Sequence, residues 1–535
     1  MKVSVARRDL SVVLPFFVLM IAMVIGCDLS TSEGPQVSEA GSAEQSPVTE
    51  PVTETDPQSR PAIKTTRLTS GGPDRQRVRD PQSMSESDAV ASIRSVLDEY
   101  SNGQDVVVVW LFDGAASSRP LVSAAAGDVR TWYDQADQPE SLSTVVATYH
   151  SDVEYLVEVP TSDSKEIEAS LAGIKSSGDG PGETMRAVEQ VLERYRSERE
   201  DQGKLVIVAL VTGNAGADWK QAEGVASLSR ELTSPIFCIG YAAPFGRRSV
   251  GGMRRTSDAT PVGPETPDLE FVTFDLAGAQ GGSLLMDSGF GPWGLEYICR
   301  AAGGSYLAIR PKASKMMMAS VFDESWPSDQ AARFDSVAMA RYAPQYIPIA
   351  QYEAMISDNA ALSSLARVAD EYEKISVLQS PSVQFSTDNE AQMKRDLDAA
   401  QQPAALLSPT VNKVYDILKD GEDDRAKLTQ PRWQAAYDLA LGQALANVVR
   451  VDGYNGMLAQ LKTGKEFTNK DSDVWVLEGA DTISTSSLMR SKLERARELL
   501  QGVIDNHPGT PWAFVAEQEL RTPIGYEWQE LDTGN

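Results

Sequence analysis

One stretch decides the fold of the largest part of this chain: Val106-Val107-Val108-Val109-Trp110-Leu111-Phe112-Asp113. An unbroken apolar run that is rich in β-branched residues is typical of a central strand in a parallel sheet. Both faces of such a strand are covered by helices, so neither face needs polar side chains. The run ends at a carboxylate, Asp113. We expect Asp113 at the carboxyl edge of the sheet, where α/β folds bind their ligands.

Further strands and helices are predicted on both sides of this run. The strands are expected at 144–149, 153–159, 205–211 and 236–241. Helical spacing of apolar residues covers 121–133, the turns after Thr184, and 222–232. Strands that alternate with helices predict a doubly wound α/β fold with a mostly parallel sheet.

Five segments together carry a resemblance to a known family. They are VVVVWLFDGAAS (106–117), the glycine loop SSGDGPGE (176–183), VIVALVTGNAGAD (206–218), PIFCIGYAAPFG (235–246) and GPWGLEYICRAAGGSYLAI (291–309). In order and spacing they resemble a von Willebrand factor A domain, over about 105–310. The resemblance implies a von Willebrand A-like domain over 85–312 with an insertion at 247–291.

The same resemblance implies a metal-ion-dependent adhesion site, in which a divalent cation has oxygen ligands and accepts a partner's carboxylate. Position by position, Asp113, Ser117 and Thr184 match three ligands of that site. Ala115 and Gly213 stand where the family has a serine and a second aspartate. The site is therefore degenerate, because one hydroxyl and one carboxylate are missing.

Two readings of this degenerate site follow. We expect no cofactor, because ligand charge governs the affinity for hard cations and nothing at Gly213 restores the lost charge. The alternative is a weak Mg²⁺ site on Asp113, Ser117 and Thr184. Asn214 and Asp218 lie close by in the sequence and would approach the site only if the loop were shifted.

The insertion carries four basic residues in an otherwise acidic protein: Arg247, Arg248, Arg254 and Arg255. Long loops that project from a sheet are often functional. The interpretation that we favour is a solvated loop with a small hairpin around 269–274. The alternative is that these arginines bind an acidic partner or the acidic C-terminal part of this chain.

The N-terminal residues predict export and anchoring. Basic residues precede an apolar run that is too short for an ordinary membrane span, which is typical of an export signal over 1–26. The run ends Val24-Ile25-Gly26-Cys27, which resembles the bacterial lipobox and implies lipidation of Cys27. Residues 27–84 are rich in Ser, Thr, Pro and Glu, so we expect a disordered tether.

From residue 328 to 530 the pattern changes to Ala, Leu, Gln and Glu, which predicts an all-α region. An amphipathic segment that ends at DNHPG precedes a helix capped by Thr510, with Pro511 in its first turn. This hairpin is similar to a tetratricopeptide unit, although no 34-residue period runs through the region. Gly453 and Gly456 are expected to break a second helix pair.

Charge and composition exclude several functions. The formal net charge of −27 argues against nucleic-acid binding, which needs a basic face. The chain has two histidines, His150 and His507, and no nucleophile motif, so we expect no enzyme. Cys238 and Cys299 are expected as buried free thiols. The resulting expectation is a membrane-anchored envelope lipoprotein that contacts unknown envelope proteins; the alternative is Mg²⁺-dependent adhesion.

Overall fold

The computed structural model describes residues 84–135, 138–175, 178, 180–243, 245, 265–267, 270, 288–309, 336–372 and 381–534. The predicted signal peptide, Cys27 and the tether up to residue 83 lie outside these residues. So do Arg247, Arg248, Arg254 and Arg255 of the insertion, and most of its strand-like segment.

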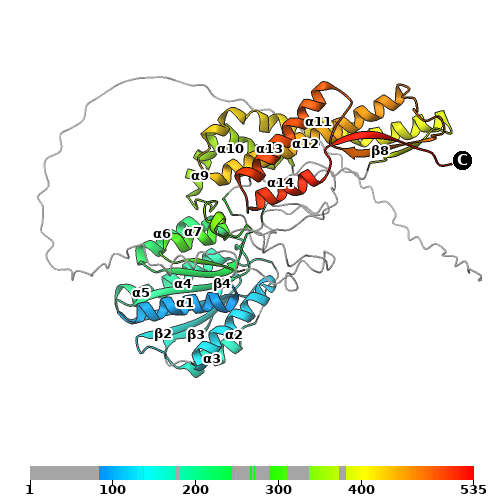
Figure 1. The fold of residues 1–535 in the computed structure, drawn as a ribbon. Helices are drawn as coiled ribbons and strands as arrows, with labels where there is room; N and C mark the ends of the chain where they lie inside the picture. The colour runs from blue at the N-terminus through cyan, green and yellow to red at the C-terminus, as the bar shows by residue number, and fades with distance from the viewer. Residues whose placement is uncertain are drawn as a thin grey trace, which may run out of the picture. The chain divides into compact units, whose positions relative to one another are not determined.

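A six-stranded sheet forms the core of the first folded part, in the order β3-β2-β1-β4-β5-β6 (Figure 1). Its strands are β1 (Val106–Asp113), β2 (Leu142–Tyr149), β3 (Val153–Thr161), β4 (Leu205–Thr212), β5 (Ile236–Tyr241) and β6 (Tyr306–Ile309). All neighbours are parallel except β2 and β3. The predicted doubly wound, mostly parallel sheet of the von Willebrand A-like class is confirmed, with the valine run as a central strand.

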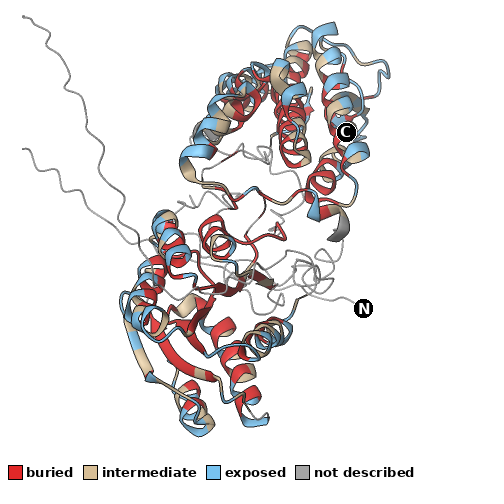
Figure 2. Ribbon diagram, turned by 90° about the vertical axis from the view of Figure 1, so that its left-hand side faces the viewer, coloured by how far each residue is buried: buried red, intermediate tan, exposed pale blue. Residues whose placement is uncertain are grey.

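Helices cover both faces of this sheet. They are α1 (Glu86–Ser101), α2 (Arg119–Gln135), α3 (Ser164–Ala172), α4 (Thr184–Arg194), α5 (Arg196–Glu200), α6 (Ala222–Leu232) and α7 (Trp293–Ala301). Trp110 and Phe112 of β1 share a core with α1, α2 and α3, whereas Val109 and Leu111 share one with α4, α6 and α7. Figure 2 shows most of the sheet as a buried layer, whereas β3 at its edge is mostly intermediate or exposed. The continuous apolar run is explained by this burial on both faces.

The second part is mainly helical. Its helices are α8 (Ser336–Ala340), α9 (Ile349–Ser357), α10 (Ala360–Tyr372), α11 (Glu390–Lys419), α12 (Pro431–Lys462), α13 (Ser487–Asn506) and α14 (Pro511–Arg521). The predicted helical C-terminal region is therefore present. It also contains a three-stranded antiparallel sheet that sequence analysis did not predict, made of β7 (Gln384–Ser386), β8 (Val474–Ala480) and β9 (Gly525–Leu531).

The long helix α12 corrects one prediction. Gly453 and Gly456 were expected to separate two helices, but α12 runs through both without interruption. A Cβ atom at Gly453 would lie 2.4 Å from Ile483 Cδ1, and one at Gly456 would lie 2.8 Å from Thr485 Cγ2. The glycines therefore allow the segment around 483–485 to approach the helix. Tertiary packing outweighs the low helix propensity of glycine here.

The final helix pair forms as the sequence predicts. The Thr510 hydroxyl accepts a hydrogen bond from the amide of Ala513 and caps α14, whose first residue is Pro511. α13 and α14 pack against each other. The tetratricopeptide likeness of this hairpin stays a prediction. Among the described residues, no helix has both the length and the apolar character that a membrane span requires.

Candidate functional site

The carboxyl ends of β1, β2 and β4 meet at one edge of the sheet, which we call the carboxyl edge. Asp113 ends β1, and the parallel register places it beside Tyr149, the last residue of β2. Thr212 ends β4 on the other side of β1. Because the three strands are neighbours, the loops that follow them share this edge, as expected for a ligand-binding position in an α/β fold.

Asp113 is the centre of a closed hydrogen-bond cluster. Its side chain is buried, with 1% exposed. Its Oδ1 accepts a hydrogen bond from the amide of Ala115 at 2.8 Å. Its Oδ2 accepts three more, from the Ser118 hydroxyl, from Thr212 Oγ1 at 2.8 Å and from Asn214 Nδ2 at 2.9 Å. The carboxylate is therefore held by groups from the loop after β1, from the last residue of β4 and from the loop that follows β4.

Ser118 and Asn214 complete the cluster. Asn214 Nδ2 also donates to Ser118 Oγ at 2.7 Å, and the amide of Gly213 donates to the same oxygen at 2.9 Å. The Ser118 hydroxyl thus donates one hydrogen bond and accepts two, which is its full capacity. Both side chains are buried, with 0% of Ser118 and 2% of Asn214 exposed.

The residues predicted as ligands are only partly brought together. Ser117 is half-buried, and its hydroxyl donates to Asn214 Oδ1 at 3.1 Å. Thr184 is the first residue of α4, and its hydroxyl lies 3.0 Å from the Tyr149 hydroxyl. Asp218 is committed elsewhere, because its carboxylate accepts from the backbone amides at 185 and 186 and caps α4.

Ser118, which was not among the predicted ligands, is the serine that contacts Asp113. The short 3₁₀ helix Ala116–Ser118 turns the chain directly after the strand. This turn brings Ser118 to the carboxylate and leaves Ser117 against Asn214. The sequence offered one signal for this contact, because Ser118 directly follows Ser117. The spacing of the family motif, however, favoured Ser117 as the ligand.

The ionisable neighbour of the cluster is Tyr149. The pKa of Tyr149 is raised well above its ordinary value. Burial is the main cause, and the negative charge of Asp113 is a smaller one. The phenol is therefore neutral at physiological pH, and its hydroxyl is hydrogen-bonded to the Thr184 hydroxyl.

The residues present do not fit the cation that the family resemblance implies. Asp113 is the one carboxylate in the cluster, and its Oδ2 already accepts three hydrogen bonds. A Cβ atom at Gly213 would lie 3.2 Å from Ser118 Oγ and 3.1 Å from Tyr241 Cε2, so a carboxylate there requires its neighbours to shift.

The cysteines and histidines of the described residues are poorly placed for nucleophilic chemistry. Cys238 and Cys299 are buried free thiols, and burial raises the pKa of each well above its ordinary value. His507 is buried with its Nδ1 2.9 Å from the Tyr342 hydroxyl, and burial lowers its pKa. His150 lies in the turn after β2, where its ring contacts Gly178.

A described piece of the insertion contacts the helical region. Glu265 forms a buried ion pair with Arg432, the second residue of α12. The Arg432 guanidinium also lies 5.4 Å from the ring centre of Trp433 and 5.6 Å from that of Trp512. At this contact the insertion supplies the negative charge of Glu265, and the helical region supplies the positive charge of Arg432. The opposite pairing, predicted for the four arginines, lies outside the described residues.

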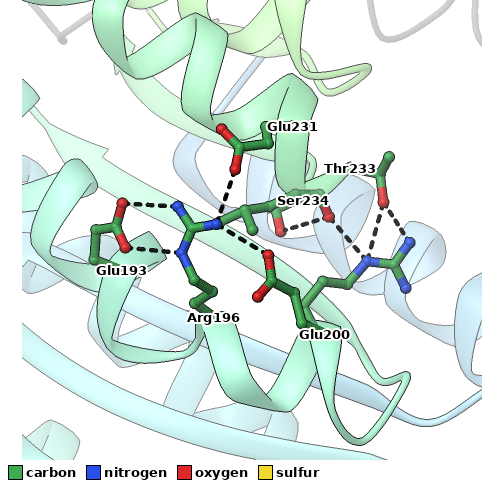
Figure 3. A network of polar contacts seen from close by, with 8 residues as sticks. Glu193, Arg196, Glu200, Glu231, Thr233 and Ser234 are labelled. Atoms are coloured by element: carbon green, nitrogen blue, oxygen red, sulfur yellow. Dashed lines mark hydrogen bonds and ion pairs between the residues drawn. The ribbon is translucent and has the colours of Figure 1, made fainter. Parts of the chain in front are cut away.

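A second polar network lies at the opposite end of the sheet. Arg196 of α5 pairs with Glu193, Glu200 and Glu231, as Figure 3 shows. α5 precedes the start of β4, so this network is far along the strands from Asp113. These hydrogen bonds raise the pKa of Arg196, which therefore stays charged. Because the acids are well exposed, such pairs contribute little stability, and we assign the network a surface role.

Comparison with known proteins gives distant likenesses in structure. No protein-family model and no curated protein matches the chain. Among solved structures, BatB from Bacteroides thetaiotaomicron, a conserved hypothetical protein, has 13% identity and a TM-score of 0.26, over 42% of this chain and 99% of that chain. Manganese-loaded TRAP from Plasmodium vivax has 13% identity and a TM-score of 0.23, over 26% of this chain and 57% of that chain.

Another similar structure is proximal thread matrix protein 1 from the mussel byssus, with a zinc-occupied MIDAS motif. It has 17% identity and a TM-score of 0.22, over 26% of this chain and 36% of that chain. The chain thus spans about half or less of the TRAP and mussel proteins. The class rests on this chain's own strand order, its helices on both faces and the position of Asp113 at the carboxyl edge. These features show a doubly wound α/β fold that is consistent with the von Willebrand A-like class.

Proposed function

We propose that this protein is a non-enzymatic, lipid-anchored protein of the bacterial cell envelope that mediates protein–protein interaction through its von Willebrand A-like domain and its helical region. The observation that carries the proposal is the state of the carboxyl edge. Asp113, Ser118, Thr212 and Asn214 hydrogen-bond to one another in a buried cluster, which supports a pre-formed base beneath the loops that would meet a partner.

The absence of activated nucleophiles among the described residues supports a binding role. The two buried thiols have raised pKa values, and neither histidine is hydrogen-bonded to a serine or cysteine in the hydrogen bonds found among those residues. Partner contact would fall on the exposed atoms around the edge, such as Ser117 and Glu183. The net charge of −27 favours protein partners with basic or neutral surfaces over nucleic acid.

Site-specific photo-crosslinking tests the interaction surface. A photoreactive residue at Ser117 or Glu183 is expected to capture a discrete partner in isolated membranes, and a chelator is expected not to reduce the yield. Ser197 on α5, which is exposed near the opposite end of the sheet, is the matched control. Equal capture at all three positions would contradict the proposed surface. Capture that the chelator abolishes would instead favour metal-dependent adhesion.

The anchor is tested separately by metabolic labelling with a fatty-acid analogue. We expect label on the unmodified protein and none on Cys27→Ser, which should also leave the membrane fraction, because stable anchoring needs acyl chains. Cys238→Ser is the control that should keep its label. Label that persists on Cys27→Ser would refute the lipid anchor and leave the interaction surface untouched.

A further inference from the structure

The side-chain amide of Asn214 lies where two loops of the carboxyl edge meet. Its Nδ2 is 2.9 Å from Asp113 Oδ2 and 2.7 Å from Ser118 Oγ, and its Oδ1 accepts from Ser117 Oγ at 3.1 Å. A carboxylate oxygen and a serine hydroxyl are the kinds of ligand that a hard cation takes in proteins. The amide nitrogen contacts both at once.

The orientation of this amide follows from its partners. Nδ2 has two N–H donors, and each faces an oxygen that accepts. Turning the amide over would place Oδ1 against the Asp113 carboxylate and leave Nδ2 facing the Ser117 hydroxyl. The observed orientation satisfies all three partners, because Ser118 still donates its own proton to Asp113.

We infer that Asn214 replaces the cation of the degenerate adhesion site, so that the carboxyl edge is held together by an amide and needs no metal. The amide supplies two fixed partial positive charges to the oxygens that an ion would otherwise neutralise. A cation can enter only if the amide leaves, and its departure would strip Asp113 and Ser118 of a buried donor, which is costly. The inference concerns the same edge as the proposed function but does not depend on a partner.

The substitution Asn214→Asp tests this inference, because it keeps the shape of the side chain and exchanges the donor for a second carboxylate. Two carboxylates would then face each other where the structure has one hydrogen bond of 2.9 Å. We expect the full-length variant to melt at a lower temperature in EDTA than the unmodified protein. Saturating Mg²⁺ or Mn²⁺ should raise its Tm by an amount on the order of 5 °C.

Two controls complete the experiment. The unmodified protein should have the same Tm in EDTA, Mg²⁺ and Mn²⁺. Asn214→Leu removes the donor without adding charge, so it should melt early and stay unaffected by either ion. If Asn214→Asp is destabilised and neither ion restores it, the amide does not mark a cation position and the inference fails.

A direct measurement covers the case in which Asn214→Asp does not fold. Mn²⁺ alone is titrated into the unmodified protein and followed by electron paramagnetic resonance. No saturable site is expected at the carboxyl edge. Saturable binding that Asp113→Asn removes would overturn the inference, while leaving open the capture of partners measured by crosslinking.

Discussion

Replacing Asp113 with alanine is expected to lower the free energy of unfolding by about 3–5 kcal/mol, because buried donors would lose their common acceptor. The donors are the Ala115 amide, the hydroxyls of Ser118 and Thr212, and Asn214 Nδ2. Urea unfolding of the full chain measures the loss. Hydrogen exchange should localise the loosening to the ends of β1 and β4.

The matched control for this prediction is Ser117→Ala, which removes one hydroxyl that is half-buried and makes one neutral hydrogen bond. Its expected effect is about 1 kcal/mol or less. A chelator should change neither value. If Asp113→Ala folds as stably as the parent, the carboxylate is not a structural centre, and a role confined to ligand binding becomes the better account.

The second large effect is expected inside the helical region. Arg450 of α12 and Glu519 of α14 form an ion pair with 7% and 11% of their side chains exposed, and Gln443 Nε2 donates to the same carboxylate at 3.0 Å. Glu519→Ala would leave the guanidinium buried without its acid. We expect a loss of about 3–5 kcal/mol in the free energy of unfolding, measured by chemical denaturation.

Combining Arg450→Met with Glu519→Leu should recover most of that loss, because removing both charges leaves neither buried alone. The exposed pair of Arg495 and Glu422 is the control, and Glu422→Ala should cost about 1 kcal/mol or less. If the single and double variants at the buried pair lose equal stability, packing and not charge explains the effect.

The sequence predicted those features of the structure that depend on the pattern of residues within one short segment. The strand 236–241 and the helix 222–232 have the bounds that were predicted, because apolar runs and helical spacing report burial directly. The cluster around Asp113 was predicted only in part. Its contacts depend on a 3₁₀ turn and on the side-chain rotation of Asn214, and neither has a periodic signature.

Long-range packing explains the other differences. The segment around Ile483 lies against Gly453, so the glycine serves a close approach and not a helix end. The strands β7, β8 and β9 come from distant parts of the chain, and β7 has three residues. No single window of sequence contains enough of that sheet to reveal it.

The burial of α12 has a consequence for how the helical region unfolds. α10, α11, α13, α14 and β9 all pack against this one helix, most of whose residues are buried. In a solenoid, each repeat touches only its neighbours, so units can be lost from an end one at a time. Here five elements pack against the same helix. We therefore expect the region to unfold in a single cooperative step. Deletion of the last hairpin, α13 and α14, would expose α12 along much of its length.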